Sequence, residues 1–167
     1  DGGASGWGNP GGYGGALSRV AGRCVLCSFS KTATTTFGLT FGWITNTRND
    51  PDSGDYNEGI IGFRNAATIM PVRAGSNYLT GGVYTAAATY QLAVALRSTG
   101  YFAMIKGGAF ANWSLLWVVS TGATASLRPA FSDYDAAWTM DDLRVADLGG
   151  VFATDYGLAT FRTIAPA

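Results

Sequence analysis

The sequence contains no histidine and one glutamate, Glu58, so the residues that most often carry acid–base catalysis are scarce. Without histidine, the usual Ser/His and Cys/His nucleophile systems are excluded. Glycoside hydrolysis needs two positioned carboxylates. Asp141 and Asp142 are adjacent, so in a strand they point to opposite faces, while Asp133 and Asp135 fall in a predicted loop. Neither pair forms a dyad on one face, and the sequence therefore predicts a protein that is not an enzyme.

Cysteine is also scarce, since Cys24 and Cys27 of the segment CVLC are the only two. In a strand, residues three apart face opposite ways and their Cα atoms are ~10 Å apart, beyond the distance of about 7 Å that a disulfide spans. A zinc site needs four ligands, which this chain cannot supply from cysteine and histidine. We expect one cysteine in the core and one on a covered second face. An intermolecular bridge through Cys24 is the alternative.

Charge is low, at 13% of residues, and eleven basic residues balance eleven acidic ones. No global basic field is therefore present to attract nucleic acid, and a net charge near zero permits association. Nine of the eleven cations are arginine, which is favoured at protein interfaces; codon bias is the alternative explanation. The sequence has no run of eighteen apolar residues, which a transmembrane helix would need, so we expect no membrane insertion.

The length of 167 residues suits one domain with a real core. The first residue is aspartate rather than methionine and no signal peptide is visible, which favours a processed product or an excerpt of a longer chain. A polar, charge-dense cytosolic signature is missing. We therefore expect an extracellular or cell-surface location.

Short runs of alternating apolar and polar residues fill most of the chain, separated by turn residues. Many short strands at such spacing indicate an all-β fold, a two-sheet antiparallel β-sandwich. The only segment in which we expect a helical turn is 134–143. The predicted strands are 16–29, 36–45, 58–64, 67–73, 90–97, 101–106, 114–119, 124–128, 140–146 and 158–163.

Several predicted strands are apolar or small on both faces. In 90–97 one face carries Tyr90, Leu92, Val94 and Leu96, which we assign to the core, and the other face is small and flat. Strand 114–119 places Leu115, Trp117 and Val119 on one face and Leu116 and Val118 on the other. Strand 24–29 opposes Val25, Cys27 and Phe29 to Cys24 and Leu26. We expect the second faces to be covered by the N-terminal segment, a loop or another subunit.

Residues 1–15, DGGASGWGNPGGYGG, are more than half glycine and form a predicted tail that precedes a sandwich domain at 16–167. Such a tail cannot fold alone, because ordering glycine costs the most backbone entropy. We expect its own domain or a neighbouring subunit to hold it, the latter in the favoured model. Trp7 and Tyr13 have no local partners to bury them, and they are the predicted anchors.

Three segments, at 89–108, 138–150 and 57–64, together resemble the laminin-G-like, concanavalin A-like jelly-roll family. TYQLAVALRSTGYFAMIKGG at 89–108 resembles the central hairpin, in which an aromatic residue opens an alternating strand and the return strand ends at glycine. WTMDDLRVADLGG at 138–150 is similar to the closing strand, where acidic residues precede an apolar-Arg-apolar triplet, and NEGIIGFR at 57–64 is similar to a middle strand. Together the segments cover roughly 90 residues in the right order.

The resemblance implies a jelly roll whose last strand returns beside the first. It also implies glycan binding or structural adhesion, sometimes with bound calcium, although this fold hosts unrelated activities. The chain departs from the family in two ways: the enzymatic branch uses paired glutamates where Glu58 stands alone, and the glycine-rich tail lies outside the family pattern.

Three further features carry hypotheses about binding. Asp50, Asp52 and Asp55 lie in NDPDSGDYNE and offer oxygen ligands for calcium, although an ordinary solvated loop is the simpler interpretation. Asn112 begins the sequon Asn-Trp-Ser on a predicted loop and is a candidate glycosylation site. The tryptophans of the predicted strands suit core packing better than sugar stacking.

Two functions from different classes fit these features. The first is a non-enzymatic structural subunit of an extracellular filament or surface layer. Copies of the chain would associate through the tail and the apolar sheet faces. The predicted contact residues are Trp7, Tyr13, Cys24 and Leu26. The second is a lectin-like carbohydrate-binding module with a loop-end site near 49–57 or 131–138, calcium-assisted in one version. A module of a longer adhesin or a phage structural protein is a third possibility.

Overall fold

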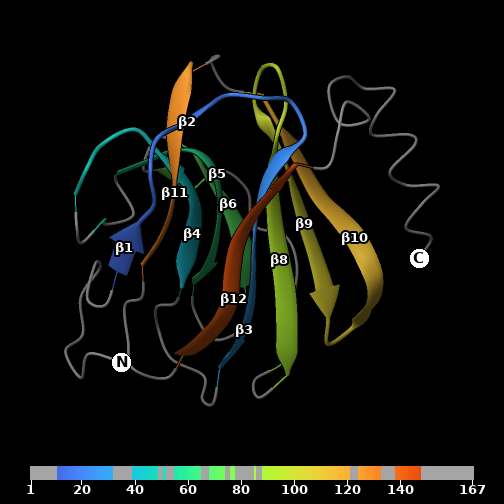
Figure 1. The fold of residues 1–167 in the computed structure, drawn as a ribbon. Coiled ribbons are helices and arrows are strands. Elements are labelled where there is room, and N and C mark those ends of the chain that lie inside the picture. The colour runs from blue at the N-terminus through green and yellow to red at the C-terminus, as the bar shows by residue number, and fades with distance from the viewer. Residues whose placement is uncertain are drawn as a thin grey trace.

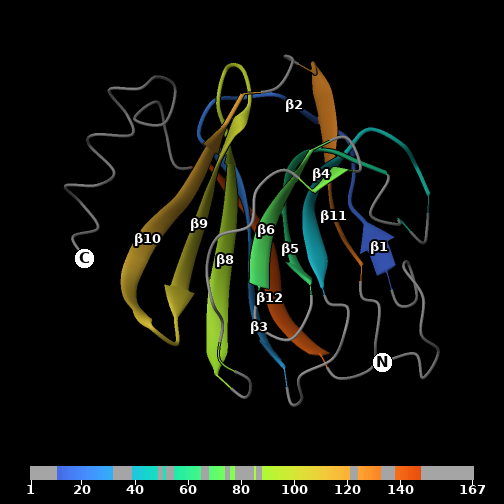
Figure 2. The same cartoon turned by 180° about the vertical axis from the view of Figure 1, so that it is seen from behind.

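The computed structural model describes residues 11–31, 39–48, 51, 55–64, 68–73, 76–77, 85, 88–120, 124–132 and 138–147. These residues form two antiparallel sheets that face each other (Figures 1 and 2). The predicted all-β sandwich is therefore confirmed. Among the described residues there is no helix with the length and apolarity needed to span a membrane.

The larger sheet has seven strands in the order β1-β11-β4-β5-β6-β7, and β2 also pairs with β11. The other sheet has five strands in the order β10-β9-β8-β3-β12. Strands of the larger sheet are β1 (Gly11–Tyr13), β2 (Leu17–Ser18), β4 (Thr40–Ile44), β5 (Tyr56–Arg64), β6 (Thr68–Arg73), β7 (Ser76–Asn77) and β11 (Ser126–Ser132). Those of the smaller sheet are β3 (Arg23–Lys31), β8 (Thr89–Leu96), β9 (Tyr101–Gly107), β10 (Phe110–Val119) and β12 (Trp138–Asp147).

Nine predicted strands overlap observed ones, and the tenth, 158–163, lies outside the described residues. The predicted strand 16–29 is in fact two strands, because the chain turns at Ala21–Gly22, where Gly22 has a φ of 88°. The predicted helical turn is wrong for 138–143, which belong to β12. Pairing with β3 along most of its length holds β12 extended.

The main core lies between the sheets and is built from the alternate residues that the sequence placed there. Tyr90, Leu92, Val94 and Leu96 of β8 all belong to it, as does Cys27 of β3. Trp43 of β4 is fully buried, and its indole Nε1 donates to the Val94 carbonyl oxygen of the opposite sheet at 3.1 Å. The period-two pattern therefore predicted this core correctly.

The five-stranded sheet also buries residues on its outer face. Cys24, Ala93, Ala95, Phe102 and Met104 form this second cluster, each no more than 2% exposed. Alternate residues of β3 and β8 belong to different clusters, so the second face of these strands is buried as predicted; that the tail, a loop or another subunit covers it stays a prediction.

The predicted facing of the strand at 114–119 is partly wrong. A register shift between Leu115 and Trp117 places Leu115 opposite Met104, on the outer face, and Trp117 opposite Ala103, in the main core. A β-bulge inserts one extra residue and so reverses the alternation beyond it, which a period-two count does not foresee.

The β8–β9 hairpin closes through residues 97–100, where the Arg97 amide donates to the Gly100 carbonyl at 2.8 Å. Gly100 has a φ of 89°, in the region that side chains disfavour. A Cβ at this position would collide with the backbone carbonyl oxygen of Val119. The hairpin therefore requires glycine here for two independent reasons.

We predict that Gly100→Ala lowers the free energy of unfolding by about 1–3 kcal/mol, because the turn must shift away from Val119. Gly15→Ala is the matched control, since a Cβ at Gly15 meets no atom within 4 Å. Urea denaturation of the two variants measures the difference. Equal stability of the two variants would contradict the strained turn.

Candidate functional site

The first candidate site is a polar cluster at the connection between β4 and β5. Asn46 Nδ2 donates to Asp55 Oδ1 at 2.8 Å, and Arg48 Nη1 donates to Asp55 Oδ2 at 3.1 Å. The main-chain amide of Arg48 in turn donates to Asn46 Oδ1 at 3.3 Å. Three side chains of different chemistry are thus held together immediately before β5. We call Asn46, Arg48 and Asp55 the polar cluster.

This polar cluster lies within reach of solvent. The side chain of Arg48 is 47% exposed and that of Asp55 is 17% exposed. A carboxylate, an amide and a guanidinium together offer both donors and acceptors, so the cluster suits a ligand with neighbouring hydroxyl groups.

Asp55 was also a predicted calcium ligand, with Asp50 and Asp52, which lie outside the described residues. Both oxygens of Asp55 accept hydrogen bonds, one of them from a guanidinium. A fixed positive charge 3.1 Å from the carboxylate opposes a second cation. Within the described ranges, no group of three acidic, cysteine or histidine residues is arranged for a metal.

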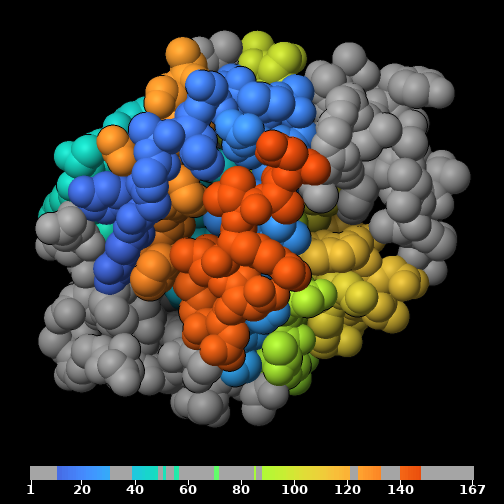
Figure 3. Space-filling model, viewed as in Figure 1, coloured from blue at the N-terminus to red at the C-terminus, as the bar shows by residue number. Residues whose placement is uncertain are grey.

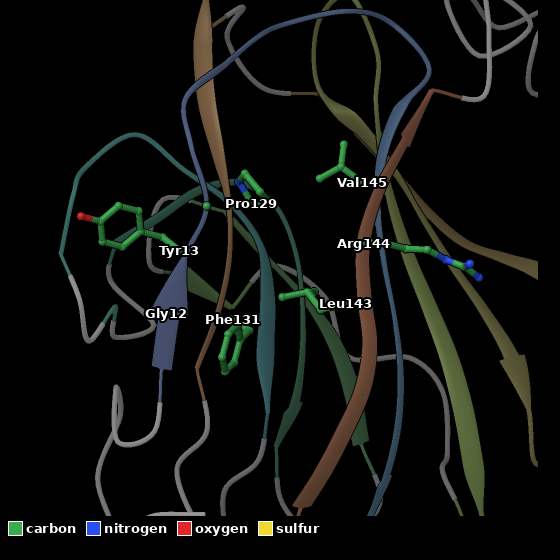
Figure 4. A pocket seen from close by; sticks show the side chains of 8 residues that line it. Gly12, Tyr13, Pro129, Phe131, Leu143, Arg144 and Val145 are labelled. Atoms are coloured by element: carbon green, nitrogen blue, oxygen red, sulfur yellow. The ribbon is translucent and has the colours of Figure 1, made fainter.

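The second candidate site is a groove on the open side of the sandwich, with a volume of about 350 Å³. One wall comes from β1 and β11 and the other from β12 (Figure 4). Figure 3 shows β11 and β12 next to each other on this face of the molecule, with β1 beyond β11. The residues that line the groove are Gly12, Tyr13, Gly14, Pro129, Phe131, Leu143, Arg144 and Val145.

Among the described strands, β1 and β12 are edge strands of the two sheets, and the groove lies between them. Val145 is opposite Val25 in the β12–β3 ladder, so it faces the space between the sheets. Leu143 and Val145 remain 38% and 39% exposed, since no described strand continues the sheet beyond β12. The main core therefore extends to the surface at this point.

The two walls of the groove differ in chemistry. Leu143 and Val145 project from β12 toward β1 and β11, whereas Arg144 points away (Figure 4). Arg144 pairs with Asp142 at 3.0 Å. On the opposite wall, glycine at position 14 lets β1 lie against Pro129, because a Cβ there would be 2.9 Å from the Pro129 ring. The interior of the groove is thus apolar, with main-chain groups along one side.

Tyr13, a predicted anchor of the tail, lies in β1 and packs on the chain's own domain. It pairs with Ala130 of β11, and the Arg128 guanidinium lies 5.5 Å from its ring centroid. The Gly14 amide also donates to the Pro129 carbonyl at 2.8 Å. Its own domain thus holds the described end of the tail. Docking on a neighbouring copy stays a prediction that now concerns residues 1–10, including Trp7, which lie outside the described residues.

The two cysteines are free thiols on opposite faces of β3, as predicted, with Cys27 in the main core and Cys24 in the outer cluster. Cys24 is 0% exposed, which opposes an intermolecular bridge through its sulfur. Leu26 lies on the same face and is partly buried against the outer cluster. A role for Leu26 in assembly stays a prediction.

Asn112 lies in β10 rather than in the predicted loop, and it is exposed. It falls in the irregular stretch between Phe110 and Ser114, where the ladder with β9 shifts register. An irregularly paired stretch of a strand resembles a loop in sequence. The predicted loop at Asn112 was therefore wrong, but the exposure that a loop implies was right. Glycosylation at Asn112 stays a prediction.

The acidic pair Asp141–Asp142 lies on the exposed edge strand β12, at a bulge where Asp142 has a φ of 55°. Neither carboxylate lines the groove, and Asp142 is paired with Arg144. The arrangement provides no enclosed pair of carboxylates for acid–base catalysis.

Sequence reasoning missed Asn46, Arg48 and the groove. The apolar-Arg-apolar triplet Leu143–Val145 was read only as a resemblance to a closing strand. Its alternation was a usable signal, because an apolar-charged-apolar pattern on an edge strand points two apolar side chains to one side.

No protein-family model and no curated protein matches this sequence. Among solved structures, the chain is similar to a functionally unknown protein from Saccharomyces cerevisiae, with a TM-score of 0.54, 8% identity and coverage of 81% of this chain and 74% of that chain. It is also similar to the metal-free carbohydrate recognition domain of Emp46p, with a TM-score of 0.54, 10% identity and coverage of 81% and 76%. At such identities the likeness shows the fold alone, which is a lectin-like jelly roll.

Burial makes both cysteines unreactive in the folded protein. It raises the pKa of the Cys24 thiol to about 12 and raises that of the Cys27 thiol as well. We predict no reaction with a thiol reagent at pH 8 in native protein and reaction of both thiols after unfolding, because only the thiolate is nucleophilic.

The same shifts predict a loss of stability at alkaline pH. Above about pH 9 the unfolded thiols release protons that the folded thiols retain, so the unfolding equilibrium constant should rise by up to about tenfold per pH unit for each thiol. Below this pH both states are protonated and the effect vanishes. Denaturation at pH 8 and pH 10 measures it, and Cys24→Ala should show the smaller change. An identical pH dependence in that variant would refute the assignment.

Proposed function

We propose that this protein is a non-catalytic, lectin-like carbohydrate-binding module. The observation that carries this proposal is the polar cluster, in which Asn46 and Arg48 hold Asp55 at an accessible end of the sandwich. Its residue types are those that form paired hydrogen bonds with neighbouring hydroxyl groups. Asp55 lies within the loop-end region near 49–57 that the sequence singled out, and Asn46 and Arg48 come shortly before it.

The fold supports this function without establishing it. A carbohydrate recognition domain with the same architecture covers 81% of this chain. Because this architecture also hosts other functions, the polar cluster carries the argument. Glycan binding also fits an extracellular or cell-surface location, which we include in the proposal.

Non-catalytic action is supported by the carboxylates that the structure describes. Asp55 is held by Asn46 and Arg48, and Asp142 pairs with Arg144 on an exposed edge. A general acid needs a carboxyl whose pKa is raised by an enclosed or apolar setting. Asp55 and Asp142 are instead paired with arginine, and the side chain of Asp142 is half exposed.

A glycan array probed with the intact protein tests this function. We predict binding to at least one glycan class and a loss of at least about tenfold in affinity for Asn46→Ala, because the ligand loses a partner and Asp55 loses a positioning hydrogen bond. Asn112→Ala is the matched control, since Asn112 is exposed on β10 far along the chain. It should bind as the unmodified protein does.

Three results of this experiment are informative. Silence across a broad array would refute carbohydrate binding, and unchanged affinity in Asn46→Ala would refute the polar cluster as the site. Adding a chelator tests the calcium-assisted version. We expect unchanged binding, because a guanidinium already neutralises Asp55.

Self-association as a structural subunit is the second candidate function. The specific observation in its favour is the groove, where Leu143 and Val145 remain more than a third exposed beside an edge of β12 that pairs with no described strand. Exposed apolar side chains that line a groove mark interaction sites more often than isolated ones do.

A further inference from the structure

The groove between β12 and the β1–β11 wall is built for an apolar chain segment. Leu143 and Val145 supply one side, and Phe131 and Pro129 supply the other. Arg144 points away from the groove and is paired with Asp142, so the apolar side chains dominate its interior. A sugar would leave most of its hydroxyl groups without partners here, whereas a large apolar side chain would fill the space.

The flanking backbone favours an extended occupant. The groove runs beside β12, which is an edge strand among the strands that the structure describes and can offer main-chain donors and acceptors to an added strand. On the opposite wall, the Phe131 and Pro129 rings fill the space beside Gly12 and Gly14, so this wall is also apolar. An extended segment with one large apolar side chain fits a strand edge that faces such a wall.

Direct pairing of two β12 strands is the less favourable way to cover this edge. A register shift separates Asp141 from Arg144 in the β12–β3 ladder, and the positive φ of Asp142 marks a bulge at the same place. Bulges and charged side chains are devices that protect edge strands against pairing with a second long strand. A glycine-rich segment adapts to such an irregular edge more easily.

The chain itself contains a matching segment in residues 1–10, DGGASGWGNP, where Trp7 is the one large apolar side chain. Glycine-rich sequence around it cannot bury the indole locally. Ten residues in extended conformation span up to about 33 Å, which is comparable to the length of a ten-residue strand such as β12. The segment joins the described chain at Gly11, beside the groove.

The direction of β1 assigns this segment to another copy. Gly11 pairs with Ser132, and the chain then runs along the groove wall to Gly14, next to Pro129. To enter its own groove, the segment would have to reverse immediately before β1.

We propose that the groove binds residues 1–10 of a second copy of this chain, with Trp7 seated among Phe131, Leu143 and Val145. The tail of each copy enters the groove of the next, so the contact is head-to-tail and generates rings or open filaments. This inference goes beyond carbohydrate binding and does not depend on it, because the polar cluster shares no residue with the groove.

A complementation experiment with the full chain tests the proposal. Trp7→Ala removes the anchor and keeps the groove, while Leu143→Arg blocks the groove and keeps the anchor. Leu143 is 38% exposed, so arginine can reach water there. Val118→Arg on β10 is the matched control at 40% exposure, on the opposite edge strand of the same sheet.

Light scattering coupled to size-exclusion chromatography gives the mass of each sample. We expect oligomers from the unmodified chain and from Val118→Arg, and monomers from either groove or tail variant alone. An equimolar mixture of Trp7→Ala and Leu143→Arg should form dimers of twice the monomer mass, because one tail and one groove remain usable. Recovery in the mixture also shows that both variants are folded.

Several outcomes would overturn the proposal. The proposal fails if the unmodified chain is monomeric, which includes a chain whose tail covers its own groove. It also fails if Trp7→Ala forms the same oligomers as the unmodified chain, or if the mixture stays monomeric. Leu143→Arg should keep its binding on the glycan array, so the failure of assembly and the failure of carbohydrate binding are separate results.

Discussion

The contact between Trp43 and Val94 ties the two sheets of this protein together, and the rest of the structure is arranged around it. The indole ring of Trp43 is fully buried between the sheets, and its nitrogen reaches the β8 backbone at 3.1 Å. A buried indole donor without a partner would be costly, so this bond fixes the position of β4 over β8. The alternating residues of β3 and β8 then form a continuous core beneath it.

That core is closed on most sides but not beside β12. Among the described strands, the larger sheet ends in the three-residue β1, which pairs with β11 and lies close to it because glycine leaves room, and the smaller sheet ends in β12. Side chains that would be internal in a closed sandwich are consequently reachable at Leu143 and Val145. The groove is therefore a direct product of where the sheets stop. Its apolar character comes from the core that it opens.

Two surfaces with different chemistry thus share one scaffold. The polar cluster presents an amide, a carboxylate and a guanidinium near the start of β5, whereas the groove presents aliphatic and aromatic carbon along β12. The first suits a hydroxyl-rich ligand and the second suits an apolar side chain on an extended backbone. The jelly roll supplies rigid positions for both, and its identity alone selects neither.

The sequence by itself determined the fold class, the core residues of β3 and β8 and the opposite facing of the two cysteines. These features follow from period-two alternation, which is a local property of a strand. Tertiary structure alone decided the bulges in β10 and β12, the meeting of Asn46 and Arg48 with Asp55, and the opening beside Leu143. The physical reason is that a register shift, a contact across a loop and an unpaired sheet edge depend on which strands become neighbours, and local alternation carries no information about that choice.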